Sequence, residues 1–207
     1  HYWNGSLIFQ AAGDEVPLLQ AAADASHRPI GGLIGPDAQV TAAKDTLEIP
    51  ELRIQMDERE TLYTLDLDGL VVPEALSAGE VEGRRIEPDD LDVITAWSVA
   101  YGVEAIGETE SPELWTRSRV SAVQGLTEGD CWILTRKGTP VAMSGFNTAI
   151  DEAVQIGGVY TPPELRGRGF GRAVVAASLL DARAEGVEQA ILFTGKQNVP
   201  AQKAYTA

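Results

Sequence analysis

The spacing of apolar residues is most regular in the C-terminal part of the chain. Leu91, Ile94, Trp97 and Tyr101 follow one another at intervals of three and four, which predicts a helix with one apolar face. A second helix is predicted to begin at Ser111-Pro112, because serine caps helix starts and proline is tolerated in the first turn. The pattern therefore predicts two helices close together in the chain.

Short apolar runs bounded by glycine, proline and charged residues predict strands around these helices. The predicted strands cover residues 83–87, 131–135, 141–148, 153–161 and 189–194, a long helix covers 171–185, and a last helix begins at residue 199. From residue 82 onward the predicted order is β-α-α-β-β-β-α-β-α. Such an order is typical of the α/β and α+β classes.

The first 76 residues have a weaker pattern. They predict strands at 5–12, 52–56 and 60–67, a strand or turn at 30–35, and helices at 18–25 and 38–47. Ser77-Ala78-Gly79-Glu80 is small, polar and contains glycine, which is typical of a linker. We therefore expect a small α/β lobe over 1–76, a linker over 77–81 and a second domain over 82–207.

Acidic residues dominate most of the chain, which has a formal net charge of −15. Residues 1–160 hold 10 lysines and arginines against 27 aspartates and glutamates, whereas residues 161–207 hold 6 against 4. A strongly acidic surface repels nucleic acid and anionic membranes, so we expect neither as a partner. An anionic ligand is expected where the basic residues gather.

The residue types that build disulfides and many metal centres are scarce. The chain has one cysteine, Cys131, and two histidines, His1 and His27. It has no apolar run of about 18 residues, and its first residues lack the basic and apolar regions of a secretory signal. These features favour a cytoplasmic protein that binds no metal.

The basic residues gather around Arg166-Gly167-Arg168-Gly169-Phe170-Gly171, between a predicted strand and a predicted helix. The first N–H groups of a helix have no partner within it and carry partial positive charge, so they bind anions. Glycine lets a ligand approach the backbone closely. This segment, the glycine loop, predicts a phosphate site with Arg172 at its rim. No Gly-Lys-Ser/Thr follows the glycines, which excludes a P-loop of the Walker type.

The glycine loop fits the pattern Q/R-x-x-G-x-G/A and resembles the acyl-CoA pyrophosphate loop of GNAT N-acetyltransferases. A second segment, Asn198-Val199-Pro200-Ala201-Gln202-Lys203-Ala204-Tyr205, is similar to the family's N-x-x-A-x-x-(L)-Y segment. The order of elements over residues 82–207 is similar as well. The resemblance implies the GNAT acyl-CoA N-acyltransferase fold, with a central mixed and mostly antiparallel sheet.

Two features depart from the family's pattern. Ala204 stands where a larger apolar residue is usual, and the sequence ends at residue 207, whereas the family continues through one or two more strands. Either the C-terminal strands are missing from this sequence or another segment completes the sheet. We favour missing strands, because a sheet edge left open would promote association. The N-terminal lobe is interpreted either as a degenerate GNAT-like copy, around residues 31–36, or as an unrelated α/β extension.

The resemblance implies a site for acetyl-CoA as co-substrate. Backbone N–H groups of the glycine loop would hold the pyrophosphate, and the pantetheine arm would pair with the strand that ends at residue 161. Gly157-Gly158 predicts a bulge or close backbone approach that moves this strand from its neighbour. The expected cofactor-binding residues are Val159, Tyr160, Thr161, Arg166, Gly167, Arg168, Gly169, Phe170, Gly171, Arg172 and Asn198.

The resemblance also implies two roles in the last motif. Tyr205 matches the tyrosine that protonates the departing CoA thiolate, and a phenol pKa of about 10 against about 8.5 for a thiol makes this transfer feasible. The alternative is that Tyr205 packs in the core. Asn198 would bond the pantetheine or the loop backbone, or else cap a helix.

The general base is left open. The position at which some relatives carry a glutamate is Gln155 here, which cannot take a proton. Glu152 and Glu104 are candidates, as are Glu108 and Glu110 between the two helices. A carboxylate in that region would bind a cationic amine, deprotonate it, or face solvent.

We expect an N-acetyltransferase that moves the acetyl group of acetyl-CoA to a small primary amine by direct attack through a tetrahedral intermediate. The alternative is a non-catalytic acyl-CoA-binding module that senses or regulates. Trp97, Tyr101 and Trp132 are candidates for the wall of the acceptor pocket, although helical spacing also places the first two in a core. The oligomeric state is open between monomer and homodimer.

Overall fold

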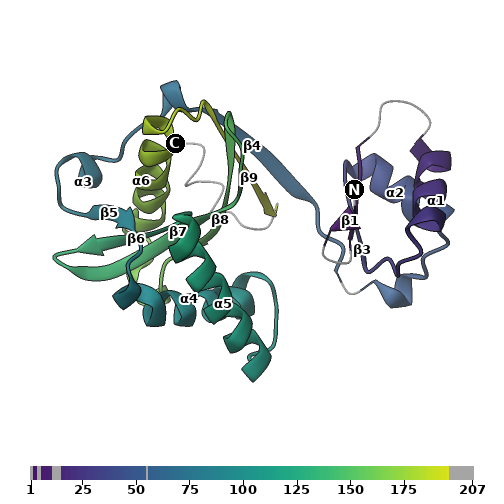
Figure 1. Cartoon of the computed structure of the whole chain (residues 1–207), viewed down its shortest axis with the longest axis horizontal. Coiled ribbons are helices and arrows are strands. Elements are labelled where there is room, and N and C mark those ends of the chain that lie inside the picture. The colour runs from purple at the N-terminus through teal and green to yellow at the C-terminus, as the bar shows by residue number, and fades with distance from the viewer. Residues whose placement is uncertain (1, 4–5, 11–14, 55, 196–207) are drawn as a thin grey trace. The chain divides into compact units, whose positions relative to one another are not determined.

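The computed structural model describes residues 2–3, 6–10, 15–54 and 56–195 (Figure 1). The chain divides into two compact units, His1–Arg59 and Glu60–Ala207. This boundary differs from the linker predicted at residues 77–81. The reason is that the strand beginning at Glu60 pairs with the sheet of the C-terminal unit.

The N-terminal unit is a small α/β structure. Its elements are β1 (Tyr2–Trp3), β2 (Ser6–Ile8), α1 (Glu15–Ser26), β3 (Gly32–Ile34), α2 (Asp37–Thr46) and a 3-10 turn at Glu51–Arg53. β2 pairs antiparallel with β1 and parallel with β3, and α1 connects the parallel pair. Leu7, Leu19 and Ala43 form its buried core. The 3-10 turn replaces the start of the strand predicted at 52–56, and the GNAT-like origin of this unit stays a prediction.

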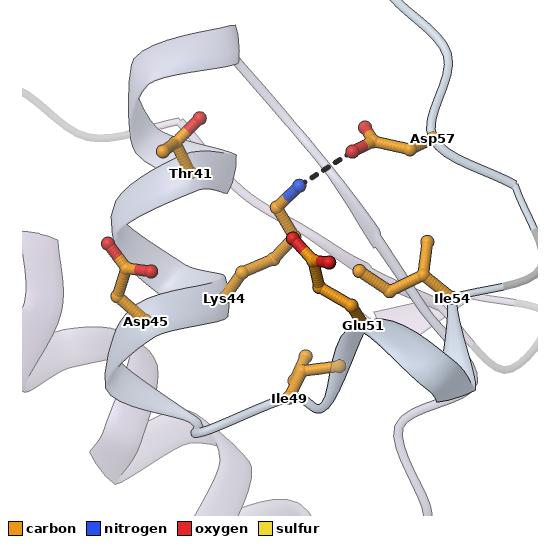
Figure 2. Close-up of a pocket in the computed structure, with 7 residues that line it drawn as sticks. All are labelled: Thr41, Lys44, Asp45, Ile49, Glu51, Ile54 and Asp57. Carbon is orange, nitrogen blue, oxygen red and sulfur yellow. Dashed lines mark hydrogen bonds and ion pairs between the residues drawn. The ribbon is translucent and has the colours of Figure 1, made fainter.

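A pocket of about 460 Å³ lies between α2 and the segment that follows it (Figure 2). Lys44 pairs there with Asp57, with 2.8 Å between Nζ and Oδ2. Asp45 and Glu51 add two carboxylates to the lining. The hydrogen bond and the charge of Lys44 lower the pKa of Asp57. The lining is therefore acidic at neutral pH.

The C-terminal unit contains the longer elements. They are β4 (Glu60–Asp66), α3 (Glu74–Ser77), β5 (Glu82–Arg85), α4 (Leu91–Ala105), α5 (Pro112–Glu128), β6 (Cys131–Arg136), β7 (Thr139–Ala149), β8 (Ala153–Tyr160), α6 (Phe170–Ala184) and β9 (Gln189–Gly195). Short 3-10 turns occupy Leu67–Gly69, Pro88–Asp90 and Pro163–Leu165. From β5 to β9 the order confirms the prediction, and the helix predicted from residue 199 lies outside the described residues.

The strands form one six-stranded sheet with the order β4-β9-β8-β7-β6-β5. β8 and β9 run parallel, and every other pair of neighbours is antiparallel. The prediction of a mixed, mostly antiparallel sheet in an α/β fold is therefore confirmed.

β4 occupies the outer side of β9 along its whole length, from Glu60 opposite Gly195 to Asp66 opposite Gln189. The sheet is completed here by a strand from before the predicted linker, which is one of the two expected alternatives. β9 is therefore an internal strand whose main chain is paired on that side. This pairing joins the segment before α3 to the C-terminal unit.

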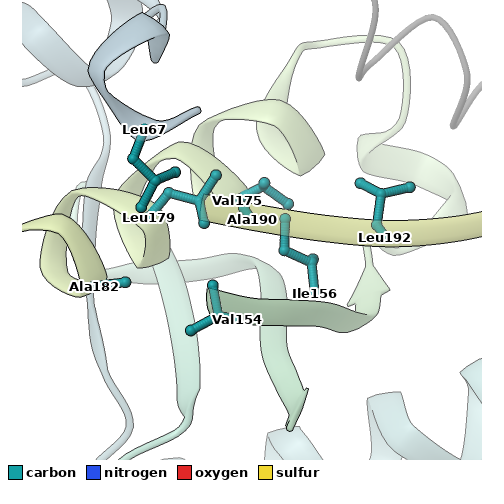
Figure 3. Packing of buried hydrophobic residues seen from close by; sticks show 8 residues of the cluster. All are labelled: Leu67, Val154, Ile156, Val175, Leu179, Ala182, Ala190 and Leu192. Atoms are coloured by element: carbon teal, nitrogen blue, oxygen red, sulfur yellow. The ribbon is translucent and has the colours of Figure 1, made fainter. Parts of the chain in front are cut away.

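Helices cover both faces of the sheet, with α6 on one face and α4 and α5 on the other (Figure 1). Beneath α6, the buried residues are Leu67, Val154, Ile156, Val175, Leu179, Ala182, Ala190 and Leu192 (Figure 3). Beneath α4 and α5, the buried residues are Ile86, Ile94, Ala122, Ile133, Met143 and Tyr160. Alternation of side chains along the strands supplies the two cores.

The ends of α5 have local causes. The hydroxyl of Ser111 accepts a hydrogen bond from the N–H of Leu114 at 3.2 Å, which confirms the predicted start. Gly129 ends the helix in the left-handed region at φ 73°. Among the described residues, no helix is both long and apolar enough to cross a membrane.

A buried ion pair connects β5 to the start of α4. Asp90 is buried, and its two oxygens accept hydrogen bonds from Arg84 at 2.6 and 3.1 Å. The N–H of Glu87 donates to the same carboxylate at 2.7 Å. Burial alone would raise the pKa of Asp90, but the hydrogen bonds from Arg84 and Glu87 outweigh it and lower the pKa overall.

We predict that Asp90→Asn lowers the free energy of unfolding by about 3 kcal/mol, because it leaves Arg84 without its charged partner. Since folding lowers the pKa of Asp90, this stabilisation is present above the ordinary aspartate pKa of about 4 and is lost as pH falls through the lowered value. Urea unfolding at pH 7 and at decreasing pH measures both effects.

The matched control is Asp92→Asn, which removes an exposed carboxylate of α4 that pairs with Arg119. It should change stability little, because exposed ion pairs contribute little. Equal stability of the Asp90 variant and the control at pH 7 would contradict the structural role of the buried pair.

Candidate active site

β8 and β9 part in the middle of the sheet. Their described pairing runs from Ala153 opposite Gln189 to Gln155 opposite Ile191, although β8 continues to Tyr160. Beyond Gln155 and Ile191 no further pair between the two strands is described. An acyl chain with amide groups can pair with the edge of β8 there.

A bulge accompanies the parting of the strands. Gly145 of β7 lies opposite Gly157 of β8, but Met143 lies opposite Tyr160, so the register of the two strands shifts between these two pairs. Gly158 lies within the shifted segment and has φ 59°. A Cβ on Gly157 would lie 2.0 Å from Oδ1 of Asn147, so a larger residue there requires the exposed side chain of Asn147 to move. The bulge predicted from this glycine pair is confirmed.

The glycine loop joins the end of β8 to the start of α6. Arg166 is extended after the 3-10 turn Pro163–Leu165, and Gly167 and Gly169 have φ of 75° and 80°. The carbonyl of Gly169 accepts the N–H of Ala173, the first turn of the helix. The first amide groups of α6 therefore lie beside the end of β8, as an anion site requires.

The predicted cofactor-binding residues differ in what they can offer. The side chain of Phe170 is buried against Val174 in the core beneath α6, so only its backbone can face a ligand. Tyr160 is also buried, while Arg168 is exposed and donates to the carbonyl of Glu164 at 3.3 Å. Asn198 lies outside the described residues. The loop therefore offers mainly backbone groups and arginines.

A cavity of about 140 Å³ lies beside α6, between the helix and the sheet. Its lining includes Arg172 and Val175 of α6, Ile191, which is the last paired residue of β9, and Ile156, which follows the last paired residue of β8. The cavity therefore reaches the parting of the strands from the face that carries the glycine loop.

On the other face, the end of α4 approaches the glycine loop. The carboxylate of Glu104 accepts hydrogen bonds from Tyr160 Oη at 3.0 Å and from Arg166 Nη2 at 2.5 Å. Arg166 also donates Nε to the carbonyl of Thr161 at 2.9 Å, and its guanidinium carbon lies 5.6 Å from the centroid of the Tyr160 ring. We call Glu104, Tyr160 and Arg166 the Glu104 cluster.

The members of this cluster shift one another's titration. The hydrogen bond from Arg166 lowers the pKa of Glu104, burial opposes it, and the hydrogen bond from Tyr160 acts with Arg166. Burial raises the pKa of Tyr160, and Glu104 raises it further. At neutral pH the cluster holds a carboxylate, a neutral phenol and a guanidinium.

The other base candidates are held elsewhere. Glu152 precedes the first residue of β8, at the end of the strand opposite to Tyr160. At about 3.3 Å per residue it lies roughly 25 Å from Tyr160. The carboxylate of Glu108 accepts both hydrogen bonds from Arg117 at 2.7 Å, and Glu110 accepts the indole N–H of Trp115 at 2.9 Å. Glu104 is the candidate that the structure brings to the glycine loop.

The aromatic residues predicted as pocket walls lie on different faces of the sheet. Trp97 and Tyr101 pack against the core beneath α4 and α5, and the ring centroid of Trp97 is 6.4 Å from that of Tyr160, so their wall role stays a prediction. Trp132 is wrong as a wall residue, because it is buried on the α6 face and donates to Asp181 at 2.7 Å. Burial raises the pKa of Tyr101, with Glu60 of β4 contributing, so the start of β4 lies near α4.

Sequence reasoning gave Tyr160 only a backbone role and did not include Glu60. Tyr160 and Glu104 are 56 residues apart, and no local pattern relates them. Tyr205 lies outside the described residues. Among the residues that the structure describes, no group of three or more His, Cys, Asp or Glu side chains could hold a metal ion.

A family model described as the Acetyltransferase (GNAT) family matches residues 100–207, which is more than half of the chain. By class, the protein is thus an acyltransferase built on a mixed α/β sheet. The chain belongs to the GNAT family of acetyltransferases. No curated protein matches it.

Solved structures share the fold at low identity. The protein yncA of Salmonella typhimurium, solved with its cofactor acetyl-CoA, is 18% identical with a TM-score of 0.50, over 60% of this chain and 76% of its own. An N-acetyltransferase from Staphylococcus aureus Mu50 is 14% identical with a TM-score of 0.50, over 60% and 79%. A GCN5-related N-acetyltransferase from Ralstonia eutropha JMP134 is 21% identical with a TM-score of 0.49, over 61% and 92%.

We predict that Cys131, the chain's one cysteine, does not react with thiol reagents in the folded protein. Burial, with the nearby charges of Asp130 and Asp90, raises the pKa of its thiol to about 12. At pH 8 about one thiol in ten thousand is then a thiolate, the reactive form. Ellman's reagent should detect one thiol in guanidinium and almost none in buffer. Rapid reaction of the native protein would contradict this burial.

Proposed function

We propose that the protein is an acetyl-CoA-dependent N-acetyltransferase that acts on a small primary amine. The observation that carries this proposal is the combination of incomplete strand pairing and glycine loop: the described pairing of β8 with β9 stops at Gln155 and Ile191, and an added Cβ on Gly171, in the first turn of α6, would lie 3.9 Å from Cγ1 of Val159. These features support a diphosphate site next to a strand that can pair with an amide-containing arm.

The donor would lie along β8. The glycine loop would take the diphosphate through backbone N–H groups, as helix starts do. The pantetheine amides would pair with the main chain of β8 near Val159, in the position that a neighbouring strand leaves open. A backbone N–H near the bulge would then polarise the thioester carbonyl and stabilise the oxyanion.

The acceptor would approach from the α4 face. Trp97 and Tyr101 supply aromatic surface there, and Glu104 and Glu60 supply negative charge that favours a cation. The ammonium must lose a proton before its nitrogen can attack the acyl carbon. The N–C bond then forms, the C–S bond breaks, and the CoA thiolate takes a proton. The reaction therefore yields an amide, CoA thiol and one proton.

Two parts of this mechanism rest on family resemblance alone. Tyr205 is proposed as the acid that protonates the thiolate, and Asn198 as a ligand of the pantetheine or the loop. The second candidate function is a non-catalytic acyl-CoA sensor, which is favoured by the engagement of Glu104 with Arg166 rather than with a free pocket. Cytoplasmic location and oligomeric state also stay predictions.

The test of the proposed function is thiol release from acetyl-CoA in the presence of a panel of primary amines. We expect release that depends on the amine, and a loss of at least about tenfold in kcat for Tyr205→Phe. Because Cys131 is predicted not to react in the folded protein, a thiol reagent can detect the released CoA directly. Tight binding of CoA without turnover on any amine would instead support the sensor.

A second prediction concerns Gly169, whose φ of 80° an L-residue adopts only under strain. Gly169→Ala should lower stability by about 1–2 kcal/mol and weaken CoA binding at least about tenfold, because the strain is relieved by moving the first amides of α6. Calorimetric titration with CoA measures the binding.

Gly138 provides the matched control. It has φ 76° in the turn between β6 and β7, and like Gly169 it has no atom within 4 Å of an added Cβ. Gly138→Ala should therefore cost similar stability and leave CoA binding unchanged. Equal CoA affinity in both variants would contradict the placement of the diphosphate at the glycine loop.

A further inference from the structure

Arg166 is the only arginine of the glycine loop whose described contacts reach the acceptor-side helix. Its guanidinium uses Nε on the carbonyl of Thr161 and Nη2 on the carboxylate of Glu104. The loop that is proposed to bind an anionic donor therefore already holds an anionic side chain. Glu104 and a diphosphate would compete for the same cation.

The Arg166–Glu104 pair differs in burial from the Arg84–Asp90 pair, which connects β5 to the start of α4. In the Arg84–Asp90 pair the arginine side chain is 35% exposed, but the carboxylate side chain is only 8% exposed and receives three hydrogen bonds. In the Arg166–Glu104 pair both side chains reach solvent, at 47% and 38%. An exposed pair is weak and exchanges easily, whereas a buried one does not. The exposed geometry suits a contact that is made and broken.

We propose that Glu104 is an exchangeable counter-ion: it holds Arg166 in the donor-free protein, the diphosphate of CoA takes Arg166 over, and the released carboxylate binds the ammonium of the acceptor. The second half of this proposal rests on the proposed function. Donor binding would then precede productive acceptor binding, because the ammonium of the acceptor needs the carboxylate that CoA releases from Arg166.

Tyr160 keeps the released carboxylate in place. Its hydroxyl donates to Oε1 of Glu104, whereas Arg166 binds Oε2, so one contact remains when the other is lost. The ring of Tyr160 is buried beneath α4, and burial keeps its phenol protonated. The carboxylate therefore stays at the end of β8, where the acyl group of the donor is proposed to lie.

Release from Arg166 would also make Glu104 a better base. The hydrogen bond from Arg166 is the largest cause that lowers the pKa of Glu104, so its loss raises that pKa toward the ordinary value. The described titratable groups that face the carboxylate are Arg166 and Tyr160, with Glu164 acting on Tyr160. Glu108 is bonded to Arg117 and is not among the groups that shift the pKa of Glu104.

The first test is calorimetric titration of the full-length chain with coenzyme A, comparing wild type, Glu104→Gln and Asp92→Asn. Gln keeps the size of the side chain and an oxygen for Tyr160 but does not hold Arg166 as an ion pair. We expect Glu104→Gln to bind CoA about two- to fivefold more tightly, the range expected when a weak exposed pair is removed.

The control Asp92→Asn makes the same charge change at the other end of α4 and should leave CoA affinity unchanged. Weaker CoA binding by Glu104→Gln than by wild type would indicate that the Arg166–Glu104 pair holds the glycine loop in its binding conformation. That result would overturn the proposed exchange of Arg166 from Glu104 to the diphosphate. Unchanged affinity, or an equal gain in the control, would overturn it as well.

The second test addresses the acceptor. With an amine that the wild type acetylates, Glu104→Gln should raise the KM of the amine at least about tenfold, leave the KM of acetyl-CoA no higher, and remove the acidic limb of the pH profile of kcat/KM. An unchanged amine KM and acidic limb would overturn the acceptor half.

The two tests separate this inference from the proposed function. CoA binding needs no turnover, so tighter binding by Glu104→Gln supports the exchange at Arg166 even in a protein that acetylates no amine. Absence of turnover on every amine would refute the proposed function, and the acceptor half with it.

Discussion

The parting of β8 and β9 is the constraint on which the rest of the site depends. Parallel strands normally satisfy each other's main-chain groups, and here the described pairing stops at Gln155 and Ile191. The bulge at Gly157-Gly158 shifts the register of β8 with β7, and β4 pairs with β9 on its other side. The end of the β8–β9 pairing thus lies between two paired halves of the sheet, and both the glycine loop and the Glu104 cluster lie toward the end of β8 beyond it.

Two of the ion pairs that arginines form at α4 and at its start differ in burial. The Arg84–Asp90 pair is buried at the start of α4 and fixes that helix on the sheet. The Arg166–Glu104 pair is exposed at the end of the same helix and joins the proposed donor site to the proposed acceptor site. One helix is therefore anchored at its first turn and carries an exchangeable contact at its last.

Local patterns predicted much of the C-terminal unit. The N-cap of α5, the bulge in β8 and the glycine loop depend on residues adjacent in sequence, and each is where the pattern placed it. The boundary between the two units and the role of Trp132 were predicted differently from what the structure has, and the strand that covers β9 was not predicted. Each depends on contacts between distant segments, such as Trp132 with Asp181, that periodicity does not encode.

The sequence by itself determined the family and the donor loop, because a helix start flanked by glycines binds anions through its own backbone. Only the tertiary structure decided that β4 completes the sheet beside β9 and that Glu104, rather than Glu152, meets Arg166. The physical reason is that strand pairing and side-chain contacts over 62 residues of sequence are fixed by how helices and strands pack, not by any local preference.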